Sequence, residues 1–222
     1  MNPKKIEKGI NSNRPYLIAL HSCTTTLGIA IIDSRSPLTS LNSSIFPIGR
    51  NLSNKIISCV EELLPASNWQ QLGRIAVSIG PGGFTSTRVT VVMARTLAQQ
   101  LDCDLDGISS FALMAPRLAN SLESTEKKNP FWIAKVLPRR GTVAGKYQIQ
   151  HCSSINNFEI GLEIEKPHLL QSPLNINPSI NASDDVNIDV LQLLRISLLA
   201  KNKNKHSQWQ KVTPIYPTSP VN

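Results

Sequence analysis

The chain has 222 residues, of which 41% are hydrophobic and 17% charged, so it is long enough and apolar enough to fold around a sizeable core. This composition excludes an intrinsically disordered protein. Lysine and arginine total 23 against 15 acidic residues, which gives a formal net charge of +8. The excess favours contact with polyanions such as RNA, or with acidic protein surfaces, but a basic and merely soluble surface explains it equally well.

The spacing of the cysteines excludes the usual cysteine-based sites. Cys23, Cys59, Cys103 and Cys152 stand far apart, and no C-x-x-C pair occurs. Metal sites need clustered ligands, and disulfide frameworks need denser cysteines. We therefore expect reduced thiols, no metal centre and a cytoplasmic location. The first apolar run, Tyr16–Leu20, is too short for a signal-peptide core or a membrane span, so no membrane association is expected.

The N-terminal half begins with a polar, basic segment, residues 1–14, which we predict to be disordered. Two β-rich runs follow, Tyr16–Leu20 and Leu27–Asp33, and the short turn between them predicts a hairpin. A third short strand is predicted at Ser44–Ile48. Apolar residues then recur at helical spacing, which predicts a helix over Leu52–Leu64.

A buried strand is predicted at Ile75–Ile79, and the sequence GPGG leads from it directly into a predicted helix, Thr85–Leu101. This helix is apolar on two sides, one formed by Val89, Met93, Leu97 and Leu101 and the other by Val91, Ala94 and Ala98. A helix of this kind must be covered twice, by its own sheet and by something else.

The C-terminal half is less regular. A short strand and turn are predicted at Asp106–Ser110, followed by a helix at Phe111–Leu122 that Pro116 either kinks or starts. Residues 152–189 have weak periodicity and predict no element. The other predicted elements are a loop at residues 123–130, a hairpin of Phe131–Leu137 and Thr142–Gln150, a helix at Val190–Ala200 and an extended, proline-containing tail.

The strongest motif is GPGGFTSTR, residues 80–88, which joins the strand to the second helix. Glycines permit turns that side chains forbid, and Thr85 or Ser86 is expected to cap the helix by accepting hydrogen bonds from its free N–H groups. Because helix N-termini attract anions, Gly80, Gly82, Gly83 and Thr85 are candidates for a nucleotide or anion loop. The lysine of a P-loop is absent, so a purely structural tight turn is the alternative interpretation.

The run SIGPGGFTSTRVTVVMARTLAQQLDCDLDGISSFALMA resembles the signature of the TsaB (YeaZ) family, G-P-G-S-F-T-G-x-R-x-G followed by A-x-x-L-A and G-V-S-S/T-L. The matching positions are Gly80, Pro81, Gly82, Phe84, Thr85, Arg88, Ala94, Leu97, Ala98, Gly107 and Ser109. The opening run LIALHSCTTTLGIAIID resembles the first hairpin of that family, and VTPIYPTSP resembles its closing segment. The resemblance is dense over the first half of the chain and thin over residues 152–189.

The resemblance implies an α/β fold of the actin-like (ribonuclease H-like, ASKHA) class with two subdomains, the second smaller and degenerate. We expect an N-terminal subdomain at residues 15–106, carrying two interface helices, and a C-terminal subdomain with an extended tail at residues 107–222. The two helices would pack against the equivalent pair of a catalytic paralogue. The residues expected at that interface are Leu52, Ile56, Val60, Leu63, Thr85, Arg88, Val89, Val92, Met93 and Leu97.

In function, the resemblance implies a non-catalytic subunit of the machinery that makes N6-threonylcarbamoyladenosine at position 37 of tRNA. The expected partners are the catalytic paralogue TsaD, the ATPase subunit TsaE and, through the complex, tRNA. No cofactor is expected, with ATP or ADP at the partner interface left open. Two alternatives also stay open: a nucleotide-binding actin-like protein with weak ATPase activity, and a homodimeric scaffold that uses the same helices.

His21 departs from the family pattern, which usually has an aspartate there to help organise a metal ion and nucleotide phosphates. Imidazole is a poor ligand for Mg²⁺, so we interpret His21 as a turn residue with local hydrogen bonds. A His21–Cys23 dyad is disfavoured, because both fall in a predicted turn with nothing nearby in sequence to orient the ring. No two histidines are four residues apart, so the H-x-x-x-H metal pair of the catalytic paralogue is missing and no catalytic residue is assigned.

Overall fold

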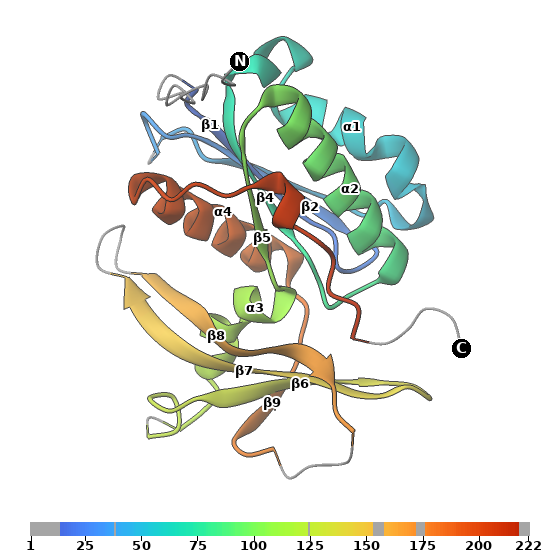
Figure 1. Ribbon diagram of the computed structural model, residues 1–222, viewed down its shortest axis with the longest axis vertical. Coiled ribbons are helices and arrows are strands. Elements are labelled where there is room, and N and C mark those ends of the chain that lie inside the picture. Colours follow the sequence, from blue (N-terminus) through green and yellow to red (C-terminus); the bar gives the residue numbers. More distant parts are fainter. Residues whose placement is uncertain (1–13, 38, 124, 153–157, 172–175, 218–222) are drawn as a thin grey trace, which may run out of the picture.

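The computed structural model describes residues 14–37, 39–123, 125–152, 158–171 and 176–217 (Figure 1). The segment predicted to be disordered, residues 1–14, therefore lies outside the described residues except for Arg14. The elements in chain order are β1 (Tyr16–His21), β2 (Leu27–Asp33), β3 (Asn42–Phe46), α1 (Leu52–Leu63), β4 (Leu72–Ser78), α2 (Phe84–Leu101), β5 (Asp104–Ile108), α3 (Ser110–Ala119), β6 (Phe131–Leu137), β7 (Gly141–Cys152), β8 (Phe158–Leu169), β9 (Ser179–Asn181) and α4 (Val186–Asn202), with short 3-10 helices at Gly49–Asn51, Ala66–Gln71 and Trp209–Lys211.

The first sheet has five strands in the order β3-β2-β1-β4-β5. The predicted hairpin is confirmed, because β1 and β2 pair antiparallel with Tyr16 opposite Asp33. Strands β4 and β5 continue the sheet parallel to β1. Parallel neighbours need a crossover connection, and α1 and α2 supply those that lead into β4 and β5.

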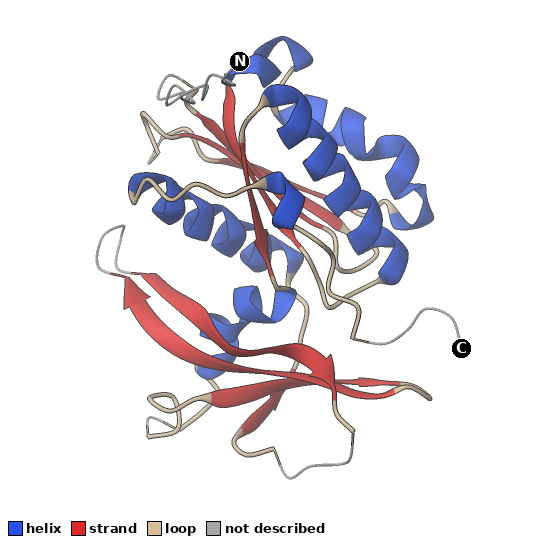
Figure 2. Ribbon diagram, in the orientation of Figure 1, coloured by secondary structure: helices blue, strands red, loops and turns tan. Residues whose placement is uncertain are grey.

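Both faces of the first sheet are buried, as Figure 2 shows from the helices on either side of it. Side chains alternate along β1, so Ile18 and Leu20 pack beneath α1 and α2 while Leu17 and Ala19 pack against α4. A sheet covered on both faces has continuous apolar strands, which is why these runs were legible in the sequence.

The second sheet has four strands in the order β8-β7-β6-β9. Its β6–β7 hairpin was predicted, whereas β8 and β9 fall in the stretch 152–189, where the sequence predicted no element. Helix α3 covers one face of this sheet, and its Phe111 shares a core with Phe131 and Tyr147. The second sheet is thus a single layer with one helix against it.

The chain returns to the first sheet after completing the second. Helix α4 packs on β1, β2 and β4, with Val190 and Leu193 in the shared core (Figure 1). Further along, Val212 of the tail is buried in the core beneath α1 and α2. The expected boundary at residue 106 is therefore corrected: the apolar side of α4 needs the second face of the first sheet, so part of 107–222 packs with the N-terminal region.

Several element ends differ from the prediction because of local capping. Helix α4 starts at Val186 rather than Val190, since the Asp185 side chain accepts a hydrogen bond from the Ile188 N–H at 3.0 Å. Pro116 lies inside α3 instead of marking its start, which Ser109 caps. Within the described parts of the chain, no helix is long and apolar enough to cross a membrane.

Candidate functional site

Helices α1 and α2 lie next to each other on one face of the first sheet (Figure 1). An open groove of about 460 Å³ runs between their outer sides. Three apolar side chains there are largely exposed: Ile57, Phe84 and Val92, the last by 57%. Apolar side chains gathered in this way on a surface mark a protein contact more often than isolated ones do. The groove is lined by Ser53, Ile56, Ile57, Phe84, Thr85, Arg88, Val89, Val92 and Met93.

The interface residues expected on α1 are mostly covered by the protein itself. Leu52 and Val60 are buried in the core under the helix, and Leu63 packs partly against that core. Ile56 is also buried but reaches the floor of the groove. Helix α1 has one apolar stripe, and this stripe packs against the sheet. The assignment of Leu52 and Val60 to a partner interface is therefore corrected. Ile57 lies outside that stripe, and its position in the sequence could have indicated an apolar residue on the outer face of the helix.

Helix α2 presents its second apolar side to the groove. Leu97 packs at the edge of the core rather than in the groove. The expected interface residues that line the groove are Thr85, Arg88, Val89, Val92 and Met93. Phe84, at the start of the helix, was not predicted; its ring lies under the Arg88 guanidinium at 5.4 Å and 5.3 Å from the Tyr216 ring.

The GPGG loop is held by contacts with two separate segments, at Ser110 and at Cys23. The Gly80 carbonyl accepts a hydrogen bond from the Ser110 N–H at 2.8 Å, and the Gly83 N–H donates to the Cys23 carbonyl at 2.7 Å. A Cβ atom on Gly82 would lie only 2.4 Å from the Cβ of Cys23, so the two turns approach closely because Gly82 has no side chain. These contacts account for the loop as a tight structural turn.

The four residues predicted as an anion loop do not form one site. Gly80 is buried, and the Gly83 N–H is already bonded. Gly82 and Gly83 line a second pocket, whereas Thr85 lines the groove. The capping prediction was wrong: Gly83 occupies the N-cap without a side-chain cap, because Thr85 and Ser86 already lie in the first turn.

His21 is the last residue of β1 rather than a turn residue, because pairing with β2 continues to His21 opposite Gly28. Its side chain is fully buried, and neither ring nitrogen has a hydrogen-bond partner among the described residues. The interpretation of His21 as a locally hydrogen-bonded turn histidine is therefore wrong. The His21 imidazole cannot replace the carboxylate that would bind a metal ion, and its two ring nitrogens are not accessible to solvent.

Cys23 lies beside His21 and is also buried. Its sulfur is 3.1 Å from the Ser78 hydroxyl and accepts from the Thr87 hydroxyl at 3.8 Å. Burial raises the pKa of the thiol, but the His21 ring and these two hydroxyls together lower it further, so the pKa lies below its ordinary value. The neighbours that act on the thiol come from β4 and α2, and no sequence spacing predicted them. Both side chains are enclosed by the protein.

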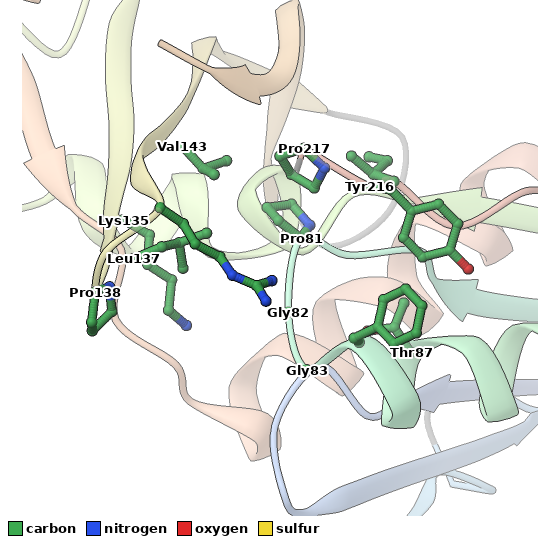
Figure 3. A pocket seen from close by; sticks show the side chains of 13 residues that line it. Pro81, Gly82, Gly83, Thr87, Lys135, Leu137, Pro138, Val143, Tyr216 and Pro217 are labelled. Carbon is green, nitrogen blue, oxygen red and sulfur yellow. The ribbon is translucent and has the colours of Figure 1, made fainter. Parts of the chain in front are cut away.

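The second pocket, of about 440 Å³, lies between the GPGG loop, the β6–β7 hairpin and the tail (Figure 3). Its cationic side chains are Lys135 and Arg140, and Lys135 forms an ion pair with Asp184 at 3.0 Å. Across the described ranges, no group of three or more His, Cys, Asp or Glu side chains is placed to hold a metal ion.

A five-stranded mixed sheet with helices on both faces, followed by a smaller second sheet, is the architecture of an actin-like α/β protein. Two solved structures match it over nearly the whole chain. YeaZ from Pseudomonas aeruginosa has a TM-score of 0.66 and 17% identity, over 90% of this chain and all of that one. A second Pseudomonas aeruginosa protein, described as similar to peptidase YeaZ, has a TM-score of 0.68 and 17% identity, over 91% and 99% of the two chains.

The sequence comparisons agree with the fold. Residues 47–153 match the family described as TsaD, tRNA N6-adenosine threonylcarbamoyltransferase. The tRNA threonylcarbamoyladenosine biosynthesis protein TsaB of Bacillus subtilis (strain 168) is 31% identical over 138 residues, which is 61% of this chain and 56% of that relative. The match thus spans little more than half of the relative's length. In sequence and in fold, the chain is thus similar to TsaB and YeaZ.

Proposed function

We propose that this chain is a non-catalytic subunit of the machinery that makes N6-threonylcarbamoyladenosine at position 37 of tRNA. In this role it binds and stabilises the catalytic actin-like paralogue TsaD in the cytoplasm, with TsaE as the ATPase subunit and tRNA bound by the assembly. The similarity to TsaB supports the pathway, since the Bacillus subtilis relative is named as a biosynthesis protein for this nucleoside.

The apolar groove between α1 and α2 is the observation that carries the proposal. Burying a large apolar side chain contributes about 1.5–3 kcal/mol, so covering Ile57, Phe84 and Val92 together would add substantially to an interface. A groove between two adjacent helices accepts the ridge of side chains that a partner helix presents at helical spacing. An actin-like paralogue has an equivalent helix pair and therefore fits this surface.

The charges around the groove favour a partner with acidic residues at the rim. The Arg88 guanidinium lies over the Phe84 ring, next to the most exposed part of the groove. A carboxylate on the partner would pair with Arg88, while the ring beneath it is buried by apolar contacts. The chain's net charge of +8 acts in the same direction, because it speeds association with an acidic surface.

A non-catalytic role is supported by the chemistry of the residues that would otherwise be candidates. His21 and Cys23 are enclosed by the protein, so neither reaches a tRNA base or an acyl donor. The sequence has no pair of histidines at a spacing that shares a metal on one helix face. The purified chain, given threonylcarbamoyl-adenylate and tRNA, is expected to form no modified adenosine above a no-protein control.

The central test is co-purification with TsaD, with the variant Val92→Glu compared to the wild type. Val92 is 57% exposed, so a glutamate there leaves the free chain folded. In a complex the same glutamate would be buried without a partner charge, and we expect binding to weaken at least about 100-fold, or about 3 kcal/mol. Binding would be measured by titration calorimetry and folding by a thermal melt.

The matched control is Val136→Glu, because Val136 is 71% exposed on the second sheet, away from the groove. It should bind TsaD like the wild type. If both variants bind TsaD normally, the groove is not the interface. Measuring the mass of the chain alone in solution tests the remaining alternative, a homodimeric scaffold. That alternative would hold if the chain forms a stable dimer that Val92→Glu dissociates and if the chain has no affinity for TsaD.

A further inference from the structure

The second pocket is built from three segments that are far apart in the sequence. Pro81, Gly82 and Gly83 form one wall, the β6–β7 hairpin forms another, and Ile215–Pro217 of the tail forms the third (Figure 3). The tail is fixed there, since the Ile215 N–H donates to the Ile79 carbonyl at 2.7 Å. A volume of about 440 Å³ is within the range of small-molecule sites, which are largely pre-formed.

Most of the wall is apolar, and part of it is aromatic. The centroids of the Phe84 and Tyr216 rings lie 5.3 Å apart, and the ring planes are tilted by 45°. Two aromatic rings, one from α2 and one from the tail, therefore lie together at the edge of the pocket. Flat rings stack favourably on such side chains. Leu137 and Val143 of the hairpin and the prolines of the loop and tail complete the apolar surface. A ligand that fills the pocket therefore has a flat, largely apolar body.

The charged groups of the pocket are all cationic. Lys135 has an ion-pair partner in Asp184, whereas the Arg140 guanidinium has no hydrogen-bond or ion-pair partner among the residues that the structure describes. None of the residues lining the pocket is an aspartate or glutamate. Proteins usually hold a nucleotide's Mg²⁺ through carboxylate oxygens, whereas the side chains that line this pocket include no carboxylate and two cations. Its chemistry fits an anion that binds without a divalent metal.

We propose that this pocket binds a small organic anion with a flat ring, and that Arg140 pairs with its anionic group independently of Mg²⁺. The ring lies against Phe84 and Tyr216, and the phosphate or carboxylate faces Arg140 and Lys135. This proposal goes beyond the scaffold function, because it concerns a ligand site that shares only Phe84 with the groove.

The test uses the full chain and two probes, AMP and indole-3-acetate. Both have a flat ring and an anionic group, but one is a nucleotide and the other an aryl carboxylate. Binding is measured by titration calorimetry without Mg²⁺ and then with millimolar Mg²⁺. Adenosine and inorganic phosphate serve as the separate halves of AMP. We expect saturable binding of at least one probe, unchanged by Mg²⁺. For AMP, each half should bind at least about tenfold more weakly than the whole, because ring and anion contribute together.

Arg140→Gln should weaken the bound probe at least about tenfold, which corresponds to about 1.4 kcal/mol. Arg139→Gln is the matched control: it changes the adjacent arginine of the same turn, which does not line the pocket, and should keep the wild-type affinity. Tyr216→Ala tests the ring wall and should also weaken binding. Thermal melts of all three variants should match the wild type, since these side chains are exposed.

The identity of the bound probe distinguishes the sources. Binding of AMP alone assigns a nucleotide, and binding of indole-3-acetate alone assigns an aryl carboxylate. The proposal is overturned if neither probe binds, if binding requires Mg²⁺, or if Arg140→Gln and Arg139→Gln affect it equally. None of these results depends on TsaD, so they leave the test of the groove untouched.

Discussion

The two sheets of this chain are covered to different extents. The five-stranded sheet has α1 and α2 on one face and α4 on the other, so its strands β1, β2 and β4 are buried on both sides. The four-stranded sheet has α3 on one face, and Val136, Leu162 and Ile164 are exposed on its strands. The comparison teaches that the first region supplies most of the apolar burial, and hence most of the stability, of the protein.

The same difference explains where the two candidate sites lie. The groove and the GPGG loop stand on the first region, whose rigid core holds α1 and α2 in place for a partner. The second pocket lies where the hairpin of the second sheet meets the first region. A partner surface thus uses the better-packed region alone, while the ligand site depends on both.

A buried charge network is specific to the first region. The Arg74 side chain is 3% exposed and donates to both carboxylate oxygens of Asp106, at 2.7 Å and 3.0 Å. Asp106 also accepts from Ser197 of α4 at 2.7 Å and from Ser207 of the tail at 2.6 Å. The network therefore ties β4, β5, α4 and the tail together.

The largest expected effect is that of Arg74→Met. Removing the guanidinium leaves the Asp106 carboxylate buried without its counter-charge, and the loss of a buried partner costs about 3–5 kcal/mol. Urea unfolding should show this decrease. The control is Arg35→Met, which breaks the Arg35–Asp33 pair at the surface, where the Arg35 side chain is 66% exposed; it should leave the unfolding midpoint almost unchanged. Equal losses in the two variants would contradict a stabilising role for the buried Arg74–Asp106 network.

A second prediction concerns the contact of α3 with β8. A Cβ atom on Gly161 would lie 2.6 Å from the Cβ of Ala115 and 2.8 Å from the Ala112 carbonyl oxygen. Gly161→Ala should therefore push the helix away and cost about 1–3 kcal/mol. Hydrogen exchange should speed up in α3 and β8 while the amides of β1 and β4 stay protected.

Leu162→Ala is the control for this change. Leu162 is the next residue on the same strand, but its side chain is exposed, so the cost should stay within about 0.5 kcal/mol. If Gly161→Ala instead speeds up exchange equally in β1 and β4, the two regions unfold as one unit. The difference in how their sheets are covered would then not give them different stabilities.

The sequence predicted the elements that have a continuous apolar run or stripe and missed β8 and β9 of the second sheet. The β1–β2 hairpin, β4 and α2 appeared as apolar runs or helical stripes. Strand β8 did not, because Gly161 and Glu163 occupy its side toward α3 while Leu162 faces solvent. Its polar and small residues face the helix and its apolar residue faces solvent, which is the reverse of an ordinary half-buried strand. The residues on either side of it in the sequence are rich in asparagine, serine and proline.

The candidate sites were predicted in part for a related reason. Helical spacing found the apolar stripe of α1 but could not say that the sheet, rather than a partner, covers Leu52 and Val60. The pocket joins Gly82, Arg140 and Tyr216, whose distance along the chain leaves no local pattern. Arg74 and Asp106 likewise meet only because β4 and β5 pair side by side.

The link between the two regions is the ion pair of Arg117 on α3 with Asp189 on α4. The guanidinium donates to both carboxylate oxygens at 3.0 Å, and Asp189 is fully buried. Burial raises the pKa of Asp189 above its ordinary value of 3.8, and the nearby Arg117 offsets only part of that rise. The folded chain thus keeps this proton to a higher pH than the unfolded chain does.

The smallest expected effect is a pH dependence that Asp189→Asn removes. Because the folded pKa is raised, ionising Asp189 favours the unfolded state, and the stability of the wild type relative to the variant should fall as pH rises above 3.8. The fall should level off once the pH has passed the folded pKa. Urea unfolding of both proteins between about pH 3 and pH 7 measures this difference. Arg117→Met should steepen the fall, since it removes the group that offsets burial. A difference that instead grows in favour of the wild type would mean that the ion pair outweighs burial, and that the two regions are joined more strongly as pH rises.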